Sequence, residues 1–513
     1  MTQGKGQSTP LPWKALLVVC AVRLAEPISA TMCFPFLPFM IRDFHLSDNP
    51  DDVGYYLGWM ASSFCIAQFC TTIFWGSFSD KYGRRPIILM GLFGTALTNT
   101  LFGFSTNYRM ALITRTLCGA VNANIGIIRS MVGEMTDHTN HARAFSMLPL
   151  TMGVGSVLGP MLGALLVKPV EHFPGFFSWL NCPAITNFFS QYPYSLPCIV
   201  GSSFCLCGAV FGYFFLEETL PSKRAPGFDE RFGLVKPEQT ASETTALLSG
   251  KGNAGYIRAE SHLPVKQSTE VSTYRQALTP EIQKVILSYI LICFMTIMES
   301  ELFVLWTTSE LTSGGLGFDS KQLGTILAIG GMGMMFMQIV VYPRIQRRYG
   351  TLPVFRTVLA LATVVLFSQG FIRELAQRQL HHALWAVLIV TVLFKASFIT
   401  VLFTSSMILV ATHGANSDKR GFINGLAEAL AAGVRAIGPA LGGTAYSWAL
   451  SASYLPQWLQ WQFVFILVST ASLSNFIASL WIRDPRTLHK PTLEQVVIPT
   501  AKIADEEEAS RVA

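Results

Sequence analysis

Charged residues are scarce in this chain of 513 residues. Asp, Glu, Lys and Arg together make up 13% of it, whereas 51% is hydrophobic, and the mean hydropathy is +0.42. Because soluble domains carry about 25% charged residues, this composition excludes a set of soluble domains. The apolar runs are long, unlike the short alternating segments of a membrane β-barrel. They predict an all-α membrane protein.

Cysteine and histidine form no recognisable site. The ten cysteines lie mostly inside apolar runs, where a free thiol is a small hydrophobe, and no Cys or His spacing resembles a zinc site. Cys182 and Cys198 lie in or beside one loop, and the sequence leaves open whether they are bridged. We therefore expect no metal and no cofactor.

Two functional classes are also excluded. No His/Asp, Ser/His or metal-ligand cluster stands at a predicted helix end, so we do not expect an enzyme. The net charge of +6 comes without a basic face that alternates with aromatic residues in a soluble segment, so we expect no nucleic-acid partner.

Twelve apolar runs approach or exceed the roughly 20 residues that a helix needs to cross a bilayer. The predicted spans lie near residues 13–41, 53–75, 87–105, 109–133, 143–168, 196–216, 284–309, 320–343, 352–372, 382–411, 420–449 and 459–482. The predicted parts are an N-terminal tail (1–12), a six-helix bundle (13–216), a flexible linker (217–283), a second six-helix bundle (284–482) and a C-terminal tail (483–513). Basic residues gather in the short loops after the second, fourth, eighth and tenth spans, which predicts that these loops, both tails and the linker are cytoplasmic.

The two halves of the chain repeat. Residues 76–86 align with residues 343–353, and Gly159-Pro160 has a counterpart in Gly438-Pro439. Matching motifs at matching places predict two bundles around a central cavity, as in many secondary transporters.

Small residues recur at four-residue intervals in the fifth span. Gly155, Gly159 and Gly163 share one helix face, which lets another backbone approach closely, and Pro160 weakens the hydrogen-bond ladder. The second half repeats this motif as Gly438, Pro439, Gly442 and Gly443. We expect these residues where the two bundles meet; tight packing alone is the alternative.

Charged residues inside predicted helices are the next signal, because each costs roughly 2.5 to 3.5 kcal/mol on insertion scales and usually faces a partner or a watery cavity. The candidates for lining the cavity are Arg23, Arg115, Asn122, Glu301, Lys395, Asn424 and Arg435. The asparagines could instead tether helices to each other.

Three acids are candidate proton carriers. Glu26 comes first, followed by Glu428 and Glu299, because a partly desolvated carboxylate binds and releases a proton readily. Glu299 and Glu301 are two residues apart and point in nearly opposite directions on a helix, so at most one of them faces the cavity. A structural ion pair between Arg23 and Glu26 is the alternative for Glu26.

Residues 76–85 match the pattern Gly-x-x-x-Asp-(Arg/Lys)-x-Gly-Arg-(Arg/Lys) at each fixed position. In this motif, and in an antiporter motif at residues 155–163, the chain resembles the major facilitator superfamily, drug:proton antiporter type. Residues 218–221, Glu-Thr-Leu-Pro, are similar to the zinc-induced-facilitator-like branch and its fungal multidrug-resistance relatives. The resemblance implies the twelve-helix major facilitator fold and transport by alternating access.

The resemblance also implies a latch at the cytoplasmic side. Asp80 would lie near the N-terminal end of the eleventh span, where the helix dipole favours an anion, and Arg84 would pair with Glu134. The other latch residues are Gly76, Lys81, Gly83 and Arg85. In the second half Arg347 replaces the acid.

These observations predict a proton-coupled antiporter that exports a small organic solute, such as a drug-like compound or a secondary metabolite. Vacuolar sequestration of a metal or metal chelate, a proton symporter or uniporter for nutrients, and a transporter-like sensor remain open. The expected partners are the small-molecule substrate, protons and the lipid bilayer, and we expect a monomer. Residues 243–248 resemble an acidic dileucine sorting signal, so the plasma membrane and a vacuolar or endosomal membrane are both expected locations.

Overall fold

The structure is a computed structural model that describes residues 11–483 with internal gaps. The gaps are residues 48, 123, 137–139, 141–143, 146, 224–225, 227, 229–277 and 414–419. Most of the predicted linker and nearly all of both tails, including the dileucine-like residues 243–248 of the linker, therefore lie outside the described residues.

The first half consists of six spanning units and a small group of helices outside them. The spanning units are α1 (Trp13–Thr31) with α2 (Leu37–Asp43), α3 (Val53–Tyr82), α4 (Arg84–Gly103), α5 (Tyr108–Val121) with α6 (Asn124–Glu134), α8 (Met147–Leu166) and α12 (Ser195–Phe215). Three short helices, α9 (Pro169–His172), α10 (Pro174–Leu180) and α11 (Pro183–Gln191), connect α8 to α12.

The second half repeats the six units without the small group. They are α16 (Pro280–Thr308), α17 (Ser320–Phe336) with η2 (Met337–Val341) and α18 (Tyr342–Tyr349), α19 (Thr351–Ser368) with η3 (Gln369–Ile372) and α20 (Arg373–Gln377), α21 (His381–His413), α22 (Arg420–Ser451) and α23 (Gln457–Leu480).

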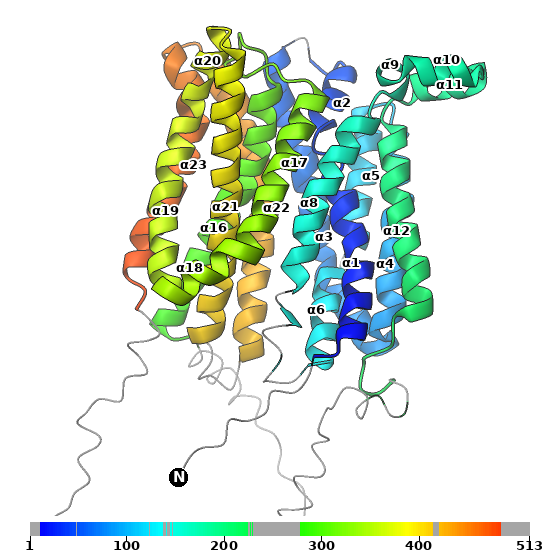
Figure 1. Ribbon diagram of the computed structural model, residues 1–513, viewed down its shortest axis with the longest axis vertical. Coiled ribbons are helices and arrows are strands. Elements are labelled where there is room, and N and C mark those ends of the chain that lie inside the picture. The colour runs from blue at the N-terminus through cyan, green and yellow to red at the C-terminus, as the bar shows by residue number, and fades with distance from the viewer. Residues whose placement is uncertain are drawn as a thin grey trace, which may run out of the picture.

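Nine helical runs among the described residues are long and apolar enough to cross a membrane. The α1–α2 pair, α8 and α22 run alongside them, which gives twelve spanning units. No strand occurs in the described part of the chain. Figure 1 shows two bundles side by side, with α1, α4 and α12 on the right and α19, α21 and α23 on the left. The all-α class and the two six-helix bundles predicted from the apolar runs are confirmed.

The basic stretch at residues 76–86, expected as a loop, is almost entirely helical. Helix α3 continues to Tyr82, Gly83 makes the turn alone, and α4 begins at Arg84. Gly83 has a φ of 107°, and Gly350 has a φ of 89° at the matching place between α18 and α19. Only glycine adopts such angles without strain, so both turns depend on it. We call this end of the molecule the basic face and the other end, where α9–α11 and α20 lie, the opposite face (Figure 1).

The two halves are in tight contact near the opposite face. A Cβ atom at Gly58 of α3 would lie 2.5 Å from the carbonyl oxygen of Pro439 on α22, and one at Gly443 would lie 2.9 Å from the Cα of Gly58. Polar contacts reinforce this seam. The backbone N–H of Ala440 donates to Ser62 Oγ at 2.8 Å, and Arg42 Nη2 donates to the carbonyl of Thr308 at 2.8 Å.

The same two helices lack such contact toward the basic face. A Cβ at Gly433 would find only Phe69, at 4.0 Å, and Cβ atoms at Gly425 or Gly76 would find nothing within 4 Å. At these three glycines α3 and α22 lack the close backbone contact that they make at Gly58 and Gly443.

The glycines of the predicted antiporter motif do not lie between the halves. They pack against α1 of their own bundle: a Cβ at Gly155 would lie 2.8 Å from the carbonyl carbon of Pro27, and one at Gly159 would lie 2.8 Å from the carbonyl oxygen of Ile28. Gly163 packs on Met32 in the same way. The expected position at the meeting of the bundles was wrong for these three, because that face of α8 is turned toward α1.

Two other sets of residues make the contact between the halves. On α8, Ser156 and Ala164 face the glycines of α17. On α22, Gly438 and Gly442 face α16 within their own half, whereas Pro439 and Gly443 face α3 across the seam.

Candidate functional site

Two buried charges from opposite halves lie within electrostatic reach of each other. Arg115 on α5 is 7% exposed and Glu301 on α16 is 6% exposed, and their charges attract each other. Among the described residues neither side chain forms a hydrogen bond or an ion pair, and Arg115 Nε has no partner. Buried charges without direct partners are costly, so such a pair indicates a functional site.

Aromatic rings hold the guanidinium in place. Its carbon lies 4.8 Å from the ring centre of Phe64 on α3 and 5.8 Å from that of Phe102 on α4. Both distances are within the range of cation–π attraction. Arg115 is therefore oriented by rings of its own half, while the negative charge that attracts it belongs to the other half.

A second charged cluster crosses the halves closer to solvent. The carboxylate of Glu428 on α22 binds Arg435 of the same helix at 2.9 Å and Arg129 on α6 at 3.0 Å, and it accepts a hydrogen bond from the Tyr289 hydroxyl at 3.0 Å. The three charged side chains are about 30% exposed. Two guanidinium groups share one carboxylate, so this cluster carries one excess positive charge.

Glu26, the first candidate for a proton carrier, is fully paired inside the first half. Arg23 Nη1 binds one carboxylate oxygen at 3.1 Å, and Asn124 Nδ2 donates to the other at 2.6 Å. Glu26 is 4% exposed. This is the structural ion pair that the sequence left open, extended by an asparagine that the sequence analysis missed.

A break between α5 and α6 positions that asparagine. The helical run stops at Val121 and resumes at Asn124, and Gln68 Nε2 on α3 donates to both the carbonyl and the side-chain oxygen of Asn122, at 2.9 and 3.1 Å. Asn122 thus tethers helices. Asn122 and Asn124 both lie near the middle of an apolar span, where polar side chains indicate a partner. The sequence analysis named Asn122 as a candidate and left out Asn124. The side chain of Asn424 lies outside the described residues.

Glu299 is turned away from the site. Its carboxylate pairs with Lys395 on α21, whose ammonium lies 3.7 Å from the ring centre of Phe303. Both charged residues are buried within the second bundle. The structure pairs Glu299 with Lys395 inside the second bundle, and the assignments of Glu299 to proton transfer and of Lys395 to the cavity stay predictions.

The latch residues come together within the first half. Arg84 binds Asp80 at 2.5 Å and Glu134 at 2.9 Å, and Lys81 lies over the ring of Tyr82. Asp80, whose side chain is 64% exposed, faces Arg84 instead of the expected start of α22. This agrees with the lack of close contact between α3 and α22 toward the basic face.

Two residues after α12 complete this cluster and were not assigned a role from the sequence. The carboxylate of Glu218 accepts the backbone N–H groups of Arg84 and Arg85 at 2.9 and 3.1 Å, and Thr219 Oγ1 donates to Glu134 at 2.5 Å. An anion at the first turn of α4 satisfies free N–H groups and the helix dipole. Glu218 also explains the small residue at Gly83, because a Cβ there would collide with its carboxylate.

Cys182 and Cys198 are both free thiols. Cys182 lies in the turn between α10 and α11, whereas Cys198 is buried against Gly103 of α4. The bridge that the sequence left open is absent.

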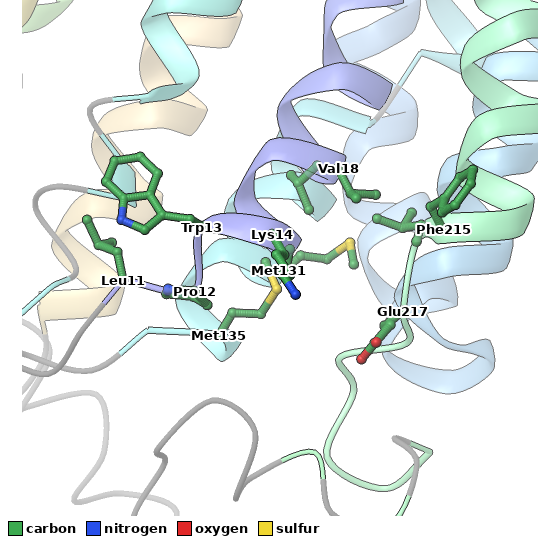
Figure 2. Close-up of a pocket in the computed structure, with 12 residues that line it drawn as sticks. Leu11, Pro12, Trp13, Lys14, Val18, Met131, Met135, Phe215 and Glu217 are labelled. Carbon is green, nitrogen blue, oxygen red and sulfur yellow. The ribbon is translucent and has the colours of Figure 1, made fainter.

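A groove of about 560 Å³ lies at the basic face of the first bundle. Figure 2 shows its lining: Trp13, Lys14 and Val18 of α1, Met131 of α6, and Met135, Phe215 and Glu217 nearby. All of these belong to one half, so the groove is separate from the charges that cross the halves.

Comparison with known proteins gives the family. Residues 19–439 and 290–506 match the model of the Major Facilitator Superfamily. The chain belongs to this superfamily. It is 30% identical over 450 residues to Protein ZINC INDUCED FACILITATOR 1 of Arabidopsis thaliana, covering 87% of each chain. It is 28% identical over 500 residues to the major facilitator superfamily multidrug transporter mfsB of Aspergillus fumigatus, covering 88% of this chain and 81% of that one.

The solved structures give the same fold. The human organic anion transporter MFSD10 superposes with a TM-score of 0.58 at 20% identity, over 92% of this chain and 100% of that one. The protein is therefore a multi-pass membrane transporter with the twelve-helix fold, and not an enzyme. The resemblance stated from residues 76–85 and 155–163 is confirmed.

Proposed function

We propose that the protein is a proton-coupled antiporter that exports a small organic solute by alternating access, with Glu301 as the proton carrier. The burial of Glu301 and Arg115, one on each half and each attracted by the other's charge, supports this proposal. Neither charge has a direct partner among the described residues, so the pair is available to a proton or a solute.

The charge of Glu301 links proton binding to the movement of the halves. When Glu301 is ionised, its attraction to Arg115 draws α16 and α5 together across the cavity. When Glu301 binds a proton, this attraction is lost and the charge of Arg115 is no longer balanced. In one state the ionised Glu301 balances the charge of Arg115. In the other state an acidic solute balances that charge instead. A proton on Glu301 and a solute at Arg115 would therefore each favour a different conformation of the halves, which is the requirement for exchange.

The Glu428 cluster would act at the mouth of the cavity. The ion pair between Arg129 of the first half and Glu428 of the second has a distance of 3.0 Å and joins the two halves. A solute that enters from the basic face would have to break this ion pair. The distribution of basic residues favours a cytoplasmic basic face, and the tight seam at Gly58 and Gly443 supports a state that is closed at the opposite face. Entry of a solute from the cytoplasm and release on the other side constitute export.

The charges of the cavity favour a solute with an acidic group. Arg115, Arg129 and Arg435 stand against Glu301 and Glu428, an excess of one positive charge that rises when Glu301 is protonated. Drug-like acids and acidic secondary metabolites meet this requirement. A metal bound to a carboxylate-bearing chelator also meets it, and the 30% identity to Protein ZINC INDUCED FACILITATOR 1 keeps that class as the second candidate.

Transport in proteoliposomes tests the proton assignment. The first step identifies solutes that cells retain to different extents with and without the protein. The solute with the largest difference in retention is then loaded into the proteoliposomes, and a pH gradient is imposed across their membrane. We expect Glu301→Gln to abolish gradient-driven flux while leaving exchange of labelled for unlabelled solute intact, because the variant mimics the protonated state.

Glu26→Gln is the matched control. It removes a buried carboxylate of the same size and keeps an acceptor for Asn124, but it leaves the buried charge of Arg23 unpaired. The variants are therefore compared at equal amounts of folded protein, where Glu26→Gln should retain gradient-driven flux. Loss of flux in Glu26→Gln together with full activity in Glu301→Gln would move the proton site to α1. Flux that ignores the gradient in the wild-type protein would exclude proton coupling altogether.

A further inference from the structure

The segment between α8 and α12 forms a small unit outside the bundle. Its two ends are joined, because the backbone N–H of Lys168 donates to the carbonyl of Pro193 at 2.9 Å. Both ends are also fixed to Asp43 at the end of α2, through Lys168 Nζ at 3.0 Å and the Tyr194 hydroxyl at 2.5 Å. Figure 1 shows α9, α10 and α11 projecting sideways beyond α12 at the opposite face.

Helices α10 and α11 form a hairpin with an aromatic interior. Phe177 is buried, and its ring centre lies 6.0 Å from that of Phe189 across the hairpin. Phe188 and Tyr192 of the second arm pack edge to face on Phe104, at the end of α4, with ring centres 5.9 and 5.4 Å away. These contacts fix the hairpin to the bundle without using its outer surface.

That outer surface is apolar. The exposed large side chains of the hairpin and its base that do not pack on the bundle are Phe173, Phe176, Trp179 and Ile185. Trp179, next to the turn at Asn181, is 79% exposed. The rings of Phe176 and Trp179 lie together, with centres 6.2 Å apart, and exposed apolar side chains that gather in this way mark an interaction site.

Charge is nearly absent from the same segment. Residues 169–194 contain no Lys or Arg, and their charged or titratable groups other than tyrosine and cysteine are Glu171 and His172, both in the short helix α9 at the base. A surface without basic residues gains nothing from an anionic membrane or an acidic partner.

We propose that the α10–α11 hairpin lies in the interfacial layer of the leaflet at the opposite face, with Phe176 and Trp179 inserted among zwitterionic lipids. The hairpin continues the lipid-facing surface of the spans, since it meets Phe104 at the end of α4 and extends past α12, whose Phe204 and Phe211 are exposed along the bundle. Tryptophan favours this layer because its ring is apolar and its N–H needs a polar partner. Helices whose apolar residues share one side lie in the plane of the interface with that side toward the acyl chains, and here the uncharged polar residues leave tryptophan as the anchor.

Tryptophan fluorescence in nanodiscs tests this placement with the full-length protein. The emission of the wild-type protein minus that of Trp179→Phe isolates Trp179, and phenylalanine preserves the apolar surface. The lipid is phosphatidylcholine, either unmodified or brominated near the glycerol end of its acyl chains. We expect brominated lipid to quench the Trp179 emission by about half, since the ring should lie at that depth, and aqueous iodide to leave it unchanged.

Trp306→Phe serves as the matched control, because Trp306 is 1% exposed and its emission should respond to neither quencher. Quenching of Trp179 by iodide and not by brominated lipid would place the hairpin in water and overturn the proposal. Protection from both quenchers would mean that protein, such as a second copy of the chain, covers Trp179, and would overturn it as well. A requirement for added phosphatidylserine before any lipid quenching would contradict the neutral character assigned to the site.

Discussion

A methyl group at Gly443 should shift the protein away from the state described here. The Cβ atom would lie 2.9 Å from the Cα of Gly58 and would collide with the carbonyl of Gly54, both on the other half. Backbone atoms cannot swing away as a side chain can, so the seam at the opposite face must open. Forcing extra atoms into a packed contact costs about 1 to 3 kcal/mol, which corresponds to a change of roughly 5- to 150-fold in the ratio of the two states.

The preceding residue, Gly442, provides a matched control. A Cβ at Gly442 would meet Leu302 of its own half at 3.7 Å, an ordinary contact. Gly442→Ala and Gly443→Ala change helix propensity equally, by roughly 1 kcal/mol per residue. Any difference between the two variants in the populations of the two states therefore comes from the contact between α3 and α22 at Gly443.

Spin labels at Gly76 and Gly425 would measure the populations. These positions lie on α3 and α22 near the basic face, where a Cβ has open space, so their separation should shorten when that face closes. Double electron–electron resonance should show a larger short-distance population in Gly443→Ala than in Gly442→Ala. Identical distance distributions in the two variants would refute the interpretation of the seam, and Gly58→Ala, whose Cβ would lie 2.5 Å from Pro439 O, repeats the test from the other helix.

Two further predictions concern the carboxylates of Glu299 and Glu218, one in a buried ion pair and one at the start of α4. Glu299→Gln should lower the free energy of unfolding by about 3 to 5 kcal/mol, since it leaves Lys395 charged and buried; the double variant Glu299→Gln with Lys395→Met should recover most of this in thermal unfolding, and no recovery would contradict the pairing. Glu218→Gln should cost about 1 to 2 kcal/mol, because the first turn of α4 loses a charged acceptor; an unchanged melting temperature would show that Glu218 does not cap α4.

Much of the fold could be predicted because it depends on local properties of the chain. The length of each apolar run fixes whether it can span, and the repeat at residues 76–86 and 343–353 fixes the two halves. The partner of Arg84 could also be named in advance, since Glu134 ends the helical run that returns to the same face as residues 76–86. The position of the turn between α3 and α4 could not be predicted from the apolar run. Helix α3 continues past its apolar residues to Tyr82, and the chain turns only at Gly83.

The site was predicted less well. Sequence spacing established that Glu299 and Glu301 point apart, but not which of them faces the other half, because that depends on how α16 is rotated in its bundle. The spacing likewise showed that three glycines of α8 share one face, namely Gly155, Gly159 and Gly163. It did not show that this face packs on α1 instead of on the other half.

The sequence by itself therefore determined the membrane class, the family and the presence of buried charges. The tertiary structure decided which charges are paired within one half, as Glu26 is with Arg23, and which attract each other across the halves, as Glu301 and Arg115 do. The reason is physical: insertion into a bilayer depends on residues close together in the chain, whereas the partner of a buried charge depends on the rotation and packing of helices that are far apart in it.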